Sequence, residues 1–532
     1  MNNTDFPLFL STAIPYVNAA PHIGHAFELL IGDVLARHRR QRGRKVYLTG
    51  GTDDHSAKNA RAAAQSGLAT AELVARNGSN FRRLQGALGV ELDDYLHTSS
   101  DPRHAPAVVA LWRRCAAAGD LYRDEYSGLY CVGCEAFLSE SDLVDGRCAT
   151  HREPLERIRE TNWFFRLSRY APKLLAELES GALRIEPRER HNEVESFIRG
   201  GLRDFSVSRS RERSRGWGIP VPDDPSQVIY VWFDALTNYL SLLGFPDCTT
   251  EWQRHWATAS AQREHLIGKD ILRFHAVYWP ALLLSAGLSL PTCVRVHGYV
   301  TISGEKIGKS LGNAVDPFAL VESYGADATR FYLLKQLHTT KDSDFSLERL
   351  LATHDDELAA KLGNLLQRAT ALAVRHPELC LRPKSERDAK DRALAAAATG
   401  ALTNVIAAVD DFALHRAIAA VFTLVAAANR YADEKAPWTL SRAFSKNLNA
   451  SSDDAAQLSN VLWHLFETLR VTAVLLAPFL PNAARSILTR LGVPLEQLAD
   501  LRHARFETET TFAPLPGPAL FPALARSAAQ LR

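Results

Sequence analysis

The sequence predicts an α/β protein with a parallel β-sheet, an inserted smaller domain, and an all-helical domain after the sheet. Apolar runs that end in polar residues alternate with helical periodicity, which is typical of a parallel sheet that carries ligand groups at its strand ends. This pattern is interrupted for about a hundred residues, which indicates an insertion. From near residue 356 the spacing of apolar residues becomes helical, which favours a bundle.

The first expected unit is a strand, a turn and a helix. Residues 6–13 are apolar enough for a buried strand, and apolar residues then recur at helical spacing at Phe27, Leu30, Ile31, Val34 and Leu35. In Rossmann-like units this order places phosphate groups at the helix N-terminus. We expect further strands at residues 46–49, 228–233, 264–267 and 295–300.

The borders of the expected domains follow these changes of pattern. Residues 1–117 and 227–304 are assigned to the parallel-sheet domain, and residues 118–226 to the insertion, which holds a cysteine cluster and an Arg-rich stretch. Residues 305–355 form a connecting region, and residues 356–532 form the helical domain. In that domain apolar residues recur at the spacing of a helix–helix seam: Leu358, Leu362, Leu365, Ala369 and Leu372.

Composition excludes several classes of protein. With 46% hydrophobic and 23% charged residues, the chain resembles soluble globular proteins, and its 532 residues predict about three to four domains. A net charge of +2 excludes a strongly basic nucleic-acid coating protein, so a polyanion would need a local patch. The apolar residues 458–480 contain His464, Glu467 and Arg470, which favours a buried helix over a membrane span.

Cysteine usage and the start of the chain indicate the compartment. Of the seven cysteines, three lie close to a histidine and the others are scattered, which is typical of a reducing compartment. The apolar run at residues 6–17 has no basic residues before it and contains two prolines, so it does not fit a signal peptide. We expect a cytoplasmic protein that does not enter a membrane.

Two separated motifs are suited to bind phosphate. His22, Gly24 and His25 lie between the first strand and its helix. Residues 306–310 read KIGKS and place Lys306 and Lys309 on a loop that contains glycine. Lys is a compact charge on a flexible stem, so it can follow a phosphate group. Each motif alone also fits a turn or a surface loop, but together they indicate chemistry on ATP.

A cluster of sulfur and imidazole ligands occurs inside the insertion. Cys131 and Cys134 form one half, and Cys148 and His151 form the other. Cys3His is a closed tetrahedral set for Zn²⁺, so the expected metal is structural and takes no part in hydrolysis. Unrelated thiols are the alternative.

Other candidates have alternatives that the residues alone leave open. One cluster at a strand end consists of Asp53, Asp54 and His55. These residues could be metal ligands, acid–base groups, an anchor for an amine or part of a solvated turn. A second set more often fills a core than a site: Trp232, Tyr239 and His275. In the helical region, a solvated face is the simplest interpretation of Asn364 and Arg368.

These candidates lie within a longer series of motifs. The series comprises residues 14–25 (IPYVNAAPHIGH), 51–55 (GTDDH), 217–224 (WGIPVPDD), 231–239 (VWFDALTNY), 267–270 (IGKD), 274–275 (FH), 279–280 (WP) and 297–300 (HGYV). In this order they resemble the methionyl-tRNA synthetases, a family of class I aminoacyl-tRNA synthetases, essentially from end to end. The resemblance is to the bacterial type with one zinc knuckle in a connective domain. The sequence ends without the appended dimerising tRNA-binding domain that some members of the family carry, so we expect a monomer.

The resemblance implies an ATP-dependent methionine--tRNA ligase. Such an enzyme joins L-methionine to AMP from Mg²⁺-bound ATP, releases pyrophosphate, and transfers the methionyl group to tRNA(Met) for translation initiation and elongation. The implied catalytic residues are His22, His25, Lys306 and Lys309. The residues implied to bind ATP are His22, Gly24, His25, Gly268, Asp270, His297, Val300 and Lys309.

The resemblance also implies residues for methionine, the anticodon and zinc. A methionine pocket is implied at Ala13, Ile14, Tyr16, Asp53, Trp232, Ala235, Leu236, Tyr239, Ile271 and His275, with the Asp53 carboxylate on the substrate ammonium. Aromatic faces suit a flexible thioether. The anticodon would be bound by Asn364, Arg368 and Trp438, since Trp can stack a base. One structural zinc would be held by Cys131, Cys134, Cys148 and His151.

Three residues at two sites depart from the family pattern. The family loop is generally KMSKS, whereas Ile307 and Gly308 replace its Met-Ser pair, and Ser56 stands where glycine is usual. Glycine adds backbone freedom and removes a hydroxyl, so the catalytic rate and the substrate choice are in question. Two alternatives therefore stay open: a synthetase paralogue with another amino acid or another acceptor, and a catalytically silent tRNA-binding protein.

Overall fold

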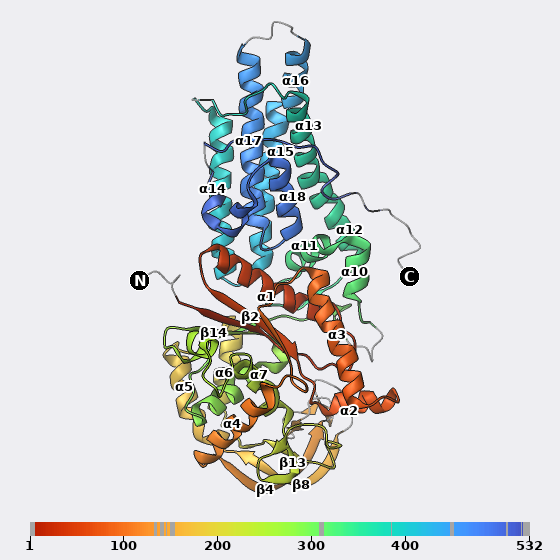
Figure 1. The fold of residues 1–532 in the computed structure, drawn as a ribbon, viewed down its shortest axis with the longest axis vertical. Helices are drawn as coiled ribbons and strands as arrows, with labels where there is room; N and C mark the ends of the chain where they lie inside the picture. The colour runs from red at the N-terminus through yellow and green to blue at the C-terminus, as the bar shows by residue number, and fades with distance from the viewer. Residues whose placement is uncertain are drawn as a thin grey trace.

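The computed structural model describes residues 6–131, 136–138, 143–144, 146–148, 155–307, 313–384, 386–446, 452–506, 509–522 and 524. The molecule is elongated, with a helical bundle at one end, a parallel β-sheet in the middle and antiparallel sheets at the other end (Figure 1). The α/β fold class predicted from the sequence is confirmed.

The central sheet has six parallel strands in the order β3-β2-β1-β14-β15-β9. Their bounds are β1 Leu8–Thr12, β2 Val46–Thr52, β3 Asp94–His97, β9 Arg184–Glu186, β14 Gln262–Gly268 and β15 Cys293–His297. The chain runs outward from β1 to β3 on one side and from β14 to β15 on the other. The strand order therefore reverses between β1 and β14, and ligands of such sheets bind beyond the carboxyl ends of the strands at that reversal.

The two faces of the sheet pack against two different cores. On β1, Leu8 and Leu10 join the core that also contains helix α1 (Ile23–Gln41) and the bundle. Phe9 points to the opposite face and joins the core of α4 (His104–Ala117), α7 (Val231–Ser241) and α9 (Trp279–Ser285). α1 lies between the sheet and the bundle (Figure 1). The sheet and the bundle thus share one continuous core.

Antiparallel strands form the end of the molecule far from the bundle (Figure 1). One sheet contains β4 (Leu121–Cys131), β5 (Ala136–Leu138), β8 (Glu156–Phe165) and β10 (Phe205–Ser206); another contains β11 (Ser208–Ser210), β12 (Pro220–Val221) and β13 (Asp224–Ile229). A short pair consists of β6 (Leu143–Val144) and β7 (Arg147–Cys148). Between β8 and β10, the segment with α5 (Ala171–Glu179), β9 and α6 (Arg188–Arg199) returns to the parallel sheet, because β9 pairs with β15. The domain borders given above stay predictions, but this strand of the expected insertion lies in the central sheet.

The expected strand at residues 228–233 is wrong. The strand β13 ends at Ile229 and lies in an antiparallel sheet, and α7 begins at Val231. Trp232 and Asp234 therefore lie on the first turn of a helix. A short apolar run fits a buried helix as well as a buried strand, and its periodicity does not distinguish the two.

The connecting region and the bundle complete the chain. β16 (Val300–Ile302), β17 (Glu305–Lys306) and β18 (Ser343–Asp344) form a small sheet beside α10 (Pro317–Tyr324), α11 (Ala326–Gln336) and α12 (Leu347–Thr353). A π-helical segment, His354–Gly363, continues into α13 (Asn364–Arg375). The other bundle helices are α14 (Ala389–Asp410), α15 (Leu414–Lys435), α16 (Pro437–Lys446), α17 (Ser452–Leu476) and α18 (Pro481–Leu491). Three further helices lie in the first two thirds of the chain: α2 (Ala57–Gln65), α3 (Thr70–Leu88) and the short α8 (Thr250–Trp252).

Two bundle helices are apolar along much of their length. α17 is the buried helix expected at residues 458–480, and its charged pair, Glu467 and Arg470, is fully buried and bonded internally. Among the described residues, α14 alone is long and apolar enough to cross a membrane by length and composition. It packs against α15 and α17, and Leu394, Ala398 and Val405 are buried in the shared core. This packing assigns α14 to the bundle.

A buried ion pair connects α1 to the bundle. The guanidinium of Arg330 on α11 lies 2.7 Å from the Asp33 carboxylate on α1, and both side chains are fully buried. The same guanidinium donates to the carbonyls of Leu88, Pro478 and Phe479. These partners come from α3 and from the turn between α17 and α18. The side chain of Arg330 therefore joins α1 and α3 to the bundle.

Replacement of Arg330 should therefore destabilise the whole chain. Arg330→Ala leaves Asp33 with a less compensated buried charge, so we expect the free energy of unfolding to fall by about 3–5 kcal/mol. Urea unfolding followed by circular dichroism measures this loss. Arg502→Ala, which breaks an exposed pair with Asp500, is the control and should unfold like the unmodified chain. Equal midpoints for all three proteins would contradict the assigned role of Arg330.

Candidate active site

The two histidines of the first motif cap helix α1. His22 is the N-cap residue; its Nδ1 accepts from the Gly24 N–H at 3.1 Å, and Nδ1 of His25 accepts from the His22 N–H at 3.1 Å. The two rings stack with centroids 3.8 Å apart. A Cβ at Gly24 would lie 2.9 Å from the His22 ring, so glycine permits this stacking. The motif thus builds a reciprocal cap from imidazoles in place of the usual Ser and Glu.

This cap fixes which nitrogen of each ring carries the proton. Because Nδ1 of both rings accepts a hydrogen bond, the neutral rings are protonated at Nε2, which is then a donor. Two such donors lie at a helix N-terminus, where the helix dipole adds partial positive charge. The arrangement suits a phosphate group.

The lysine motif flanks the same helix end. Lys306 lies in β17, where it pairs with Thr301, while Lys309 lies outside the described residues. Ile307 is buried in the core that contains Ile23 of α1. After the motif, the Val315 carbonyl accepts from the Ile23 N–H at 3.1 Å. The chain at Val315, after the lysine motif, is therefore held at the N-terminus of α1 beside the histidine cap.

The expected ATP residues gather at the carboxyl ends of β14 and β15. A Cβ at Gly268 would lie 3.1 Å from Oδ1 of Asp270 and 3.7 Å from Nε2 of His297. Val300 begins the next strand, β16, and is buried. Gly268, Asp270 and His297 therefore lie close together at the strand ends.

A carboxylate on α1 connects this region to β1. Oε2 of Glu28 lies 2.9 Å from Nε2 of His297, and its Oε1 accepts from the Ala13 N–H at 2.8 Å. Burial opposes protonation of His297, but the Glu28 carboxylate outweighs it and raises the pKa of His297. The sequence reasoning missed Glu28; its signal was a position three residues after His25 on the same helix face.

Aromatic side chains gather beside β1. Trp232 stacks on Phe274 with centroids 3.9 Å apart and lies 6.4 Å from both Tyr16 and His275. His275 is buried, and burial lowers its pKa to about 4, so it is neutral. Its Nδ1 donates to the Ile271 carbonyl at 3.0 Å, and its Nε2 accepts from the Tyr239 hydroxyl at 2.8 Å. Both polar ends of this pair are satisfied internally, which leaves an apolar cluster.

The remaining expected methionine residues border the same cluster. Ala235 and Leu236 are buried on α7, Ile271 is half-buried, and Ala13 follows β1. Ile14 contacts Gly51 so closely that a Cβ there would lie 2.9 Å from its side chain. The buried Nε1 of Trp232 has no hydrogen-bond partner among the described residues. Phe274, the stacking partner of Trp232, was noted from the sequence only as part of a motif.

Three acidic and imidazole residues follow β2. Asp53 is buried and forms an isolated parallel β-bridge with Tyr16. Its N–H donates to the Pro15 carbonyl at 2.9 Å. His55 Nδ1 lies 2.7 Å from Asp234, and the other Asp234 oxygen lies 2.5 Å from Nε2 of His104. Burial works against the charge on His55, but Asp234 raises its pKa. This places Asp53 beside Tyr16 and His55 in a buried network with Asp234 and His104, while Asp54 accepts from the Ser99 N–H and hydroxyl.

The unusual Ser56 has a structural role. Its hydroxyl accepts from the Asn59 N–H at 3.1 Å and caps α2, and its φ of −79° requires no glycine. The Asn59 side chain in turn donates to the carbonyls of Asp53 and Asp54. The serine therefore stabilises the turn that carries the acidic residues.

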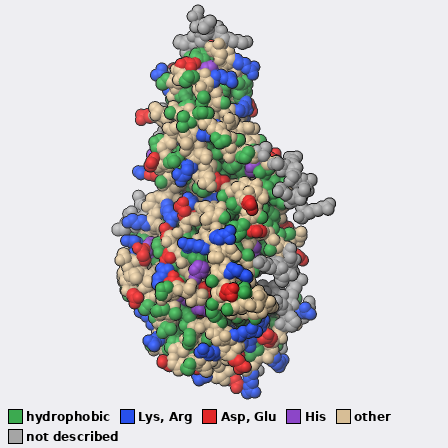
Figure 2. Space-filling view, turned by 45° about the vertical axis from the view of Figure 1, so that its right-hand side comes forward, with side chains coloured by type: hydrophobic (Ala, Val, Ile, Leu, Met, Phe, Trp, Pro, Cys, Tyr) green, Lys and Arg blue, Asp and Glu red, His purple; other side chains and the backbone are tan. Residues whose placement is uncertain are grey.

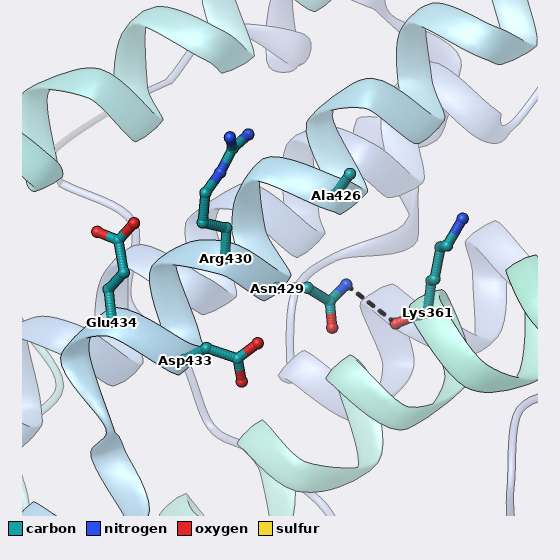
Figure 3. A pocket seen from close by; sticks show the side chains of 6 residues that line it. All are labelled: Lys361, Ala426, Asn429, Arg430, Asp433 and Glu434. Carbon is teal, nitrogen blue, oxygen red and sulfur yellow. Dashed lines mark hydrogen bonds between the residues drawn. The ribbon is translucent and has the colours of Figure 1, made fainter.

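The expected anticodon residues meet at the far end of the bundle. The guanidinium of Arg368 lies 4.3 Å from the centroid of Trp438, and Arg368 and Asn364 are exposed on α13. Beside them a groove of about 510 Å³ is lined by Lys361, Ala426, Asn429, Arg430, Asp433 and Glu434 (Figure 3). The Asn429 amide donates to the Lys361 carbonyl at 3.3 Å across this groove (Figure 3). Exposed cationic and amide groups thus surround a stackable aromatic ring.

The expected zinc ligands lie only partly in the described chain. Cys131 at the end of β4 and Cys148 at the end of β7 are buried, whereas Cys134 and His151 lie outside the described residues. Within the described ranges, no group of three or more His, Cys, Asp or Glu residues could hold a metal. Two buried thiols at strand ends fit half of the expected set.

Two family models match the chain. The model for tRNA synthetases class I (M) matches residues 8–154 and 141–370, and the model for the anticodon binding domain of methionyl tRNA ligase matches residues 383–510. The methionine--tRNA ligase of Mesorhizobium japonicum is 40% identical over 516 residues, which are 96% of this chain and 95% of the relative. That of Mycobacterium bovis is 42% identical over 491 residues, 91% and 92% of the two chains.

Solved structures agree with these matches. The methionyl-tRNA synthetase of Mycobacterium tuberculosis bound by methionyl-adenylate has a TM-score of 0.90 at 40% identity and covers 97% of this chain and 100% of that chain. Its free state has a TM-score of 0.84 at 37% identity, with 98% and 99% covered. The synthetase model covers most of the chain before the bundle, the part named the catalytic half, and relatives at about 40% identity cover nearly the whole length. This chain therefore belongs to the methionyl-tRNA synthetases, a family of class I aminoacyl-tRNA synthetases.

Proposed function

We propose that this chain is a methionine--tRNA ligase, which activates L-methionine with ATP and transfers it to tRNA(Met) for translation initiation and elongation. The observation that carries the proposal is the meeting of a phosphate-binding helix cap with a neutral aromatic cluster at the strand-order reversal. Relatives named methionine--tRNA ligase at 40% identity along nearly the whole chain support it.

In the first step the methionine carboxylate attacks the α-phosphorus of ATP and pyrophosphate leaves. No base is needed because the nucleophile is already ionised, so the protein supplies position and charge. The Nε2–H groups of His22 and His25 would bind the phosphate oxygens, and Lys306 and Lys309 would follow the departing pyrophosphate. Gly24 keeps the helix cap open to the phosphates. Gly268, Asp270, His297 and Val300 would hold the adenosine part.

Methionine would be chosen by the neutrality of the aromatic cluster. A thioether is flexible and accepts hydrogen bonds weakly, so a cluster whose polar groups are already satisfied favours it over a polar side chain. The Asp53 carboxylate would bind the ammonium group. The buried Trp232 Nε1 is the one donor of the cluster that the described residues leave unbonded, which suits the weak acceptor sulfur.

The second step transfers the methionyl group to the terminal adenosine of tRNA, and AMP leaves. The anticodon would bind at the far end of the bundle through Asn364, Arg368 and Trp438. Arg368 already lies over the Trp438 ring, so an unstacked base would share or replace that contact. Lys and Arg side chains are interspersed with acidic ones over the visible face (Figure 2), so tRNA would be met by local groups and not by a uniformly basic surface.

Two metals accompany the proposal. Mg²⁺ bound with ATP would neutralise charge on the phosphates. Cys131, Cys134, Cys148 and His151 would hold one structural Zn²⁺, which would fix the turns of the antiparallel end. The burial of Cys131 and Cys148 supports this set. A monomeric state, a cytoplasmic location and the absence of a membrane segment stay predictions.

An amino-acid panel tests the proposed substrate. In ATP–pyrophosphate exchange we expect activity with L-methionine. With leucine, isoleucine or valine the exchange rate should be at most about a hundredth of the methionine rate, because the aromatic cluster binds a thioether side chain better. Exchange with another amino acid and not with methionine would establish the paralogue instead.

His25→Ala tests the phosphate cap. It removes one donor from the developing charge, so the exchange rate should fall by about 10²–10³-fold. His25→Gln is the matched control, because Gln can retain the capping bond to the His22 N–H and should preserve the melting temperature. tRNA binding, measured by filter retention, should stay unchanged in both variants. Unaltered exchange by His25→Ala would refute the catalytic role.

Trp438→Ala tests the anticodon site. Loss of one base stack should lower kcat/KM for tRNA in aminoacylation by about 10–100-fold. The tRNA-free exchange reaction should be unaffected, and Trp438→Phe, which keeps a stacking face, should recover most of the loss. An equal loss in the exchange assay would show that Trp438 acts on the catalytic half.

A further inference from the structure

The first turn of α15 touches the catalytic half through one loop. This loop, residues 338–342, follows α11 and lies between the bundle and the end of β15. The Leu414 N–H of α15 donates to the Thr339 hydroxyl at 3.0 Å, and that hydroxyl lies 3.3 Å from Nδ1 of His415. Thr339 is almost fully buried.

The donor and acceptor roles in this contact are determined. Burial, with the neighbouring His338 and Arg416, lowers the pKa of His415 to about 4, so its ring is neutral. Nδ1 of His415 accepts from the Thr339 N–H at 3.5 Å, so this nitrogen carries no proton and also accepts from the Thr339 hydroxyl, which in turn accepts from the Leu414 N–H. One hydroxyl group thus makes two hydrogen bonds to the same helix turn.

The backbone of the same residue holds the expected adenosine segment. The Thr339 carbonyl accepts from the Gly298 N–H at 3.0 Å, directly after His297. A Cβ at Gly298 would lie 2.1 Å from the Lys341 carbonyl, so the loop and the segment are in the closest contact that glycine allows. Asp342 accepts from the Tyr299 N–H at 3.0 Å and pairs with Lys269 at 2.6 Å. The loop therefore determines where residues 297–300 lie.

Few contacts hold the loop to α15. A cavity of about 460 Å³ opens on its outer side, with His338, Thr340, Phe412 and His415 among its lining residues. The His338 ring lies 4.2 Å from the His415 ring, and Asp342 holds the other end of the loop to Tyr299 and Lys269. The Thr339 hydroxyl adds the hydrogen bonds that connect the loop to the first turn of α15.

We propose that Thr339 is a positioning residue for ATP: its hydroxyl fastens the loop to the first turn of α15, and its carbonyl places Gly298 and the adjoining adenosine segment. The proposal rests on the proposed function, because it assumes that residues 297–300 contact adenosine. Thr339 touches neither substrate and acts through Gly298.

Substitutions that differ by the hydroxyl alone test this role. Thr339→Val and Thr339→Ala should raise KM for ATP in the exchange reaction by about tenfold, because a buried N–H loses its acceptor and the loop shifts. KM for methionine should change by less than about twofold. Thr339→Ser keeps the hydroxyl and should retain the unmodified KM for ATP. If the Thr339→Val variant does not fold, the comparison of KM for ATP between Thr339→Ala and Thr339→Ser still tests the role of the hydroxyl.

A neighbouring threonine supplies the matched control. The Thr340 hydroxyl contacts His338 within its own loop at 3.5 Å and does not reach α15, so Thr340→Val should leave both KM values unchanged. An unchanged KM for ATP in Thr339→Ala would overturn the proposal, and so would a rise in Thr339→Ser or Thr340→Val as large as the rise in Thr339→Ala. Exchange by the unmodified chain with methionine is measured in the same series, so failure of the proposed function is seen separately.

Discussion

The buried pair of Asp33 and Arg330 is the constraint on which the arrangement of the molecule depends. A charged pair without solvent is tolerated only when its remaining donors are satisfied, and the Arg330 guanidinium bonds three backbone carbonyls besides the carboxylate. Those carbonyls belong to the catalytic half and to the bundle. Helix α1, which carries the histidine cap at one end, is therefore positioned by both. The two halves share a core as well, so the phosphate cap and the bundle form one structural unit.

Charge is distributed unevenly around the strand ends. The aromatic cluster is neutral, because burial keeps His275 unprotonated and its two ring nitrogens are bonded to Tyr239 and Ile271. Nearby, Asp234 lies between His55 and His104 and holds a buried charge. In the proposed function, this separation would place polar groups at the ammonium and phosphate ends of the substrate and would leave its side chain in apolar surroundings, which is what selection of a thioether requires.

The sequence predicted those parts of the site that neighbouring residues form better than those that residues far apart in the chain form together. The strand, cap and helix around His22 are encoded within about twenty residues and are confirmed, as are the strands β2 and β14. Residues 228–233 failed because a short apolar run does not reveal whether it begins a helix. Glu28, Phe274 and His104 were missed since each acquires its role from a partner far away in the chain. Periodicity carries no information on such pairings.

Helix α15 relates the two ends of the molecule. Its 22 residues span about 33 Å, from the loop that holds Gly298 to the turn that precedes Trp438. Both ends are fixed by backbone conformations that few residues adopt: Phe412 has a φ of 53° below the helix, and Ala436 has a φ of 42° above it. Phe412 lies under the Arg295 guanidinium, and Tyr431 bonds Asp391 on α14. Helix α15 thus runs without interruption from its contact with the Gly298 loop to the turn before Trp438, so it is the direct structural connection between the strand ends and the expected anticodon residues.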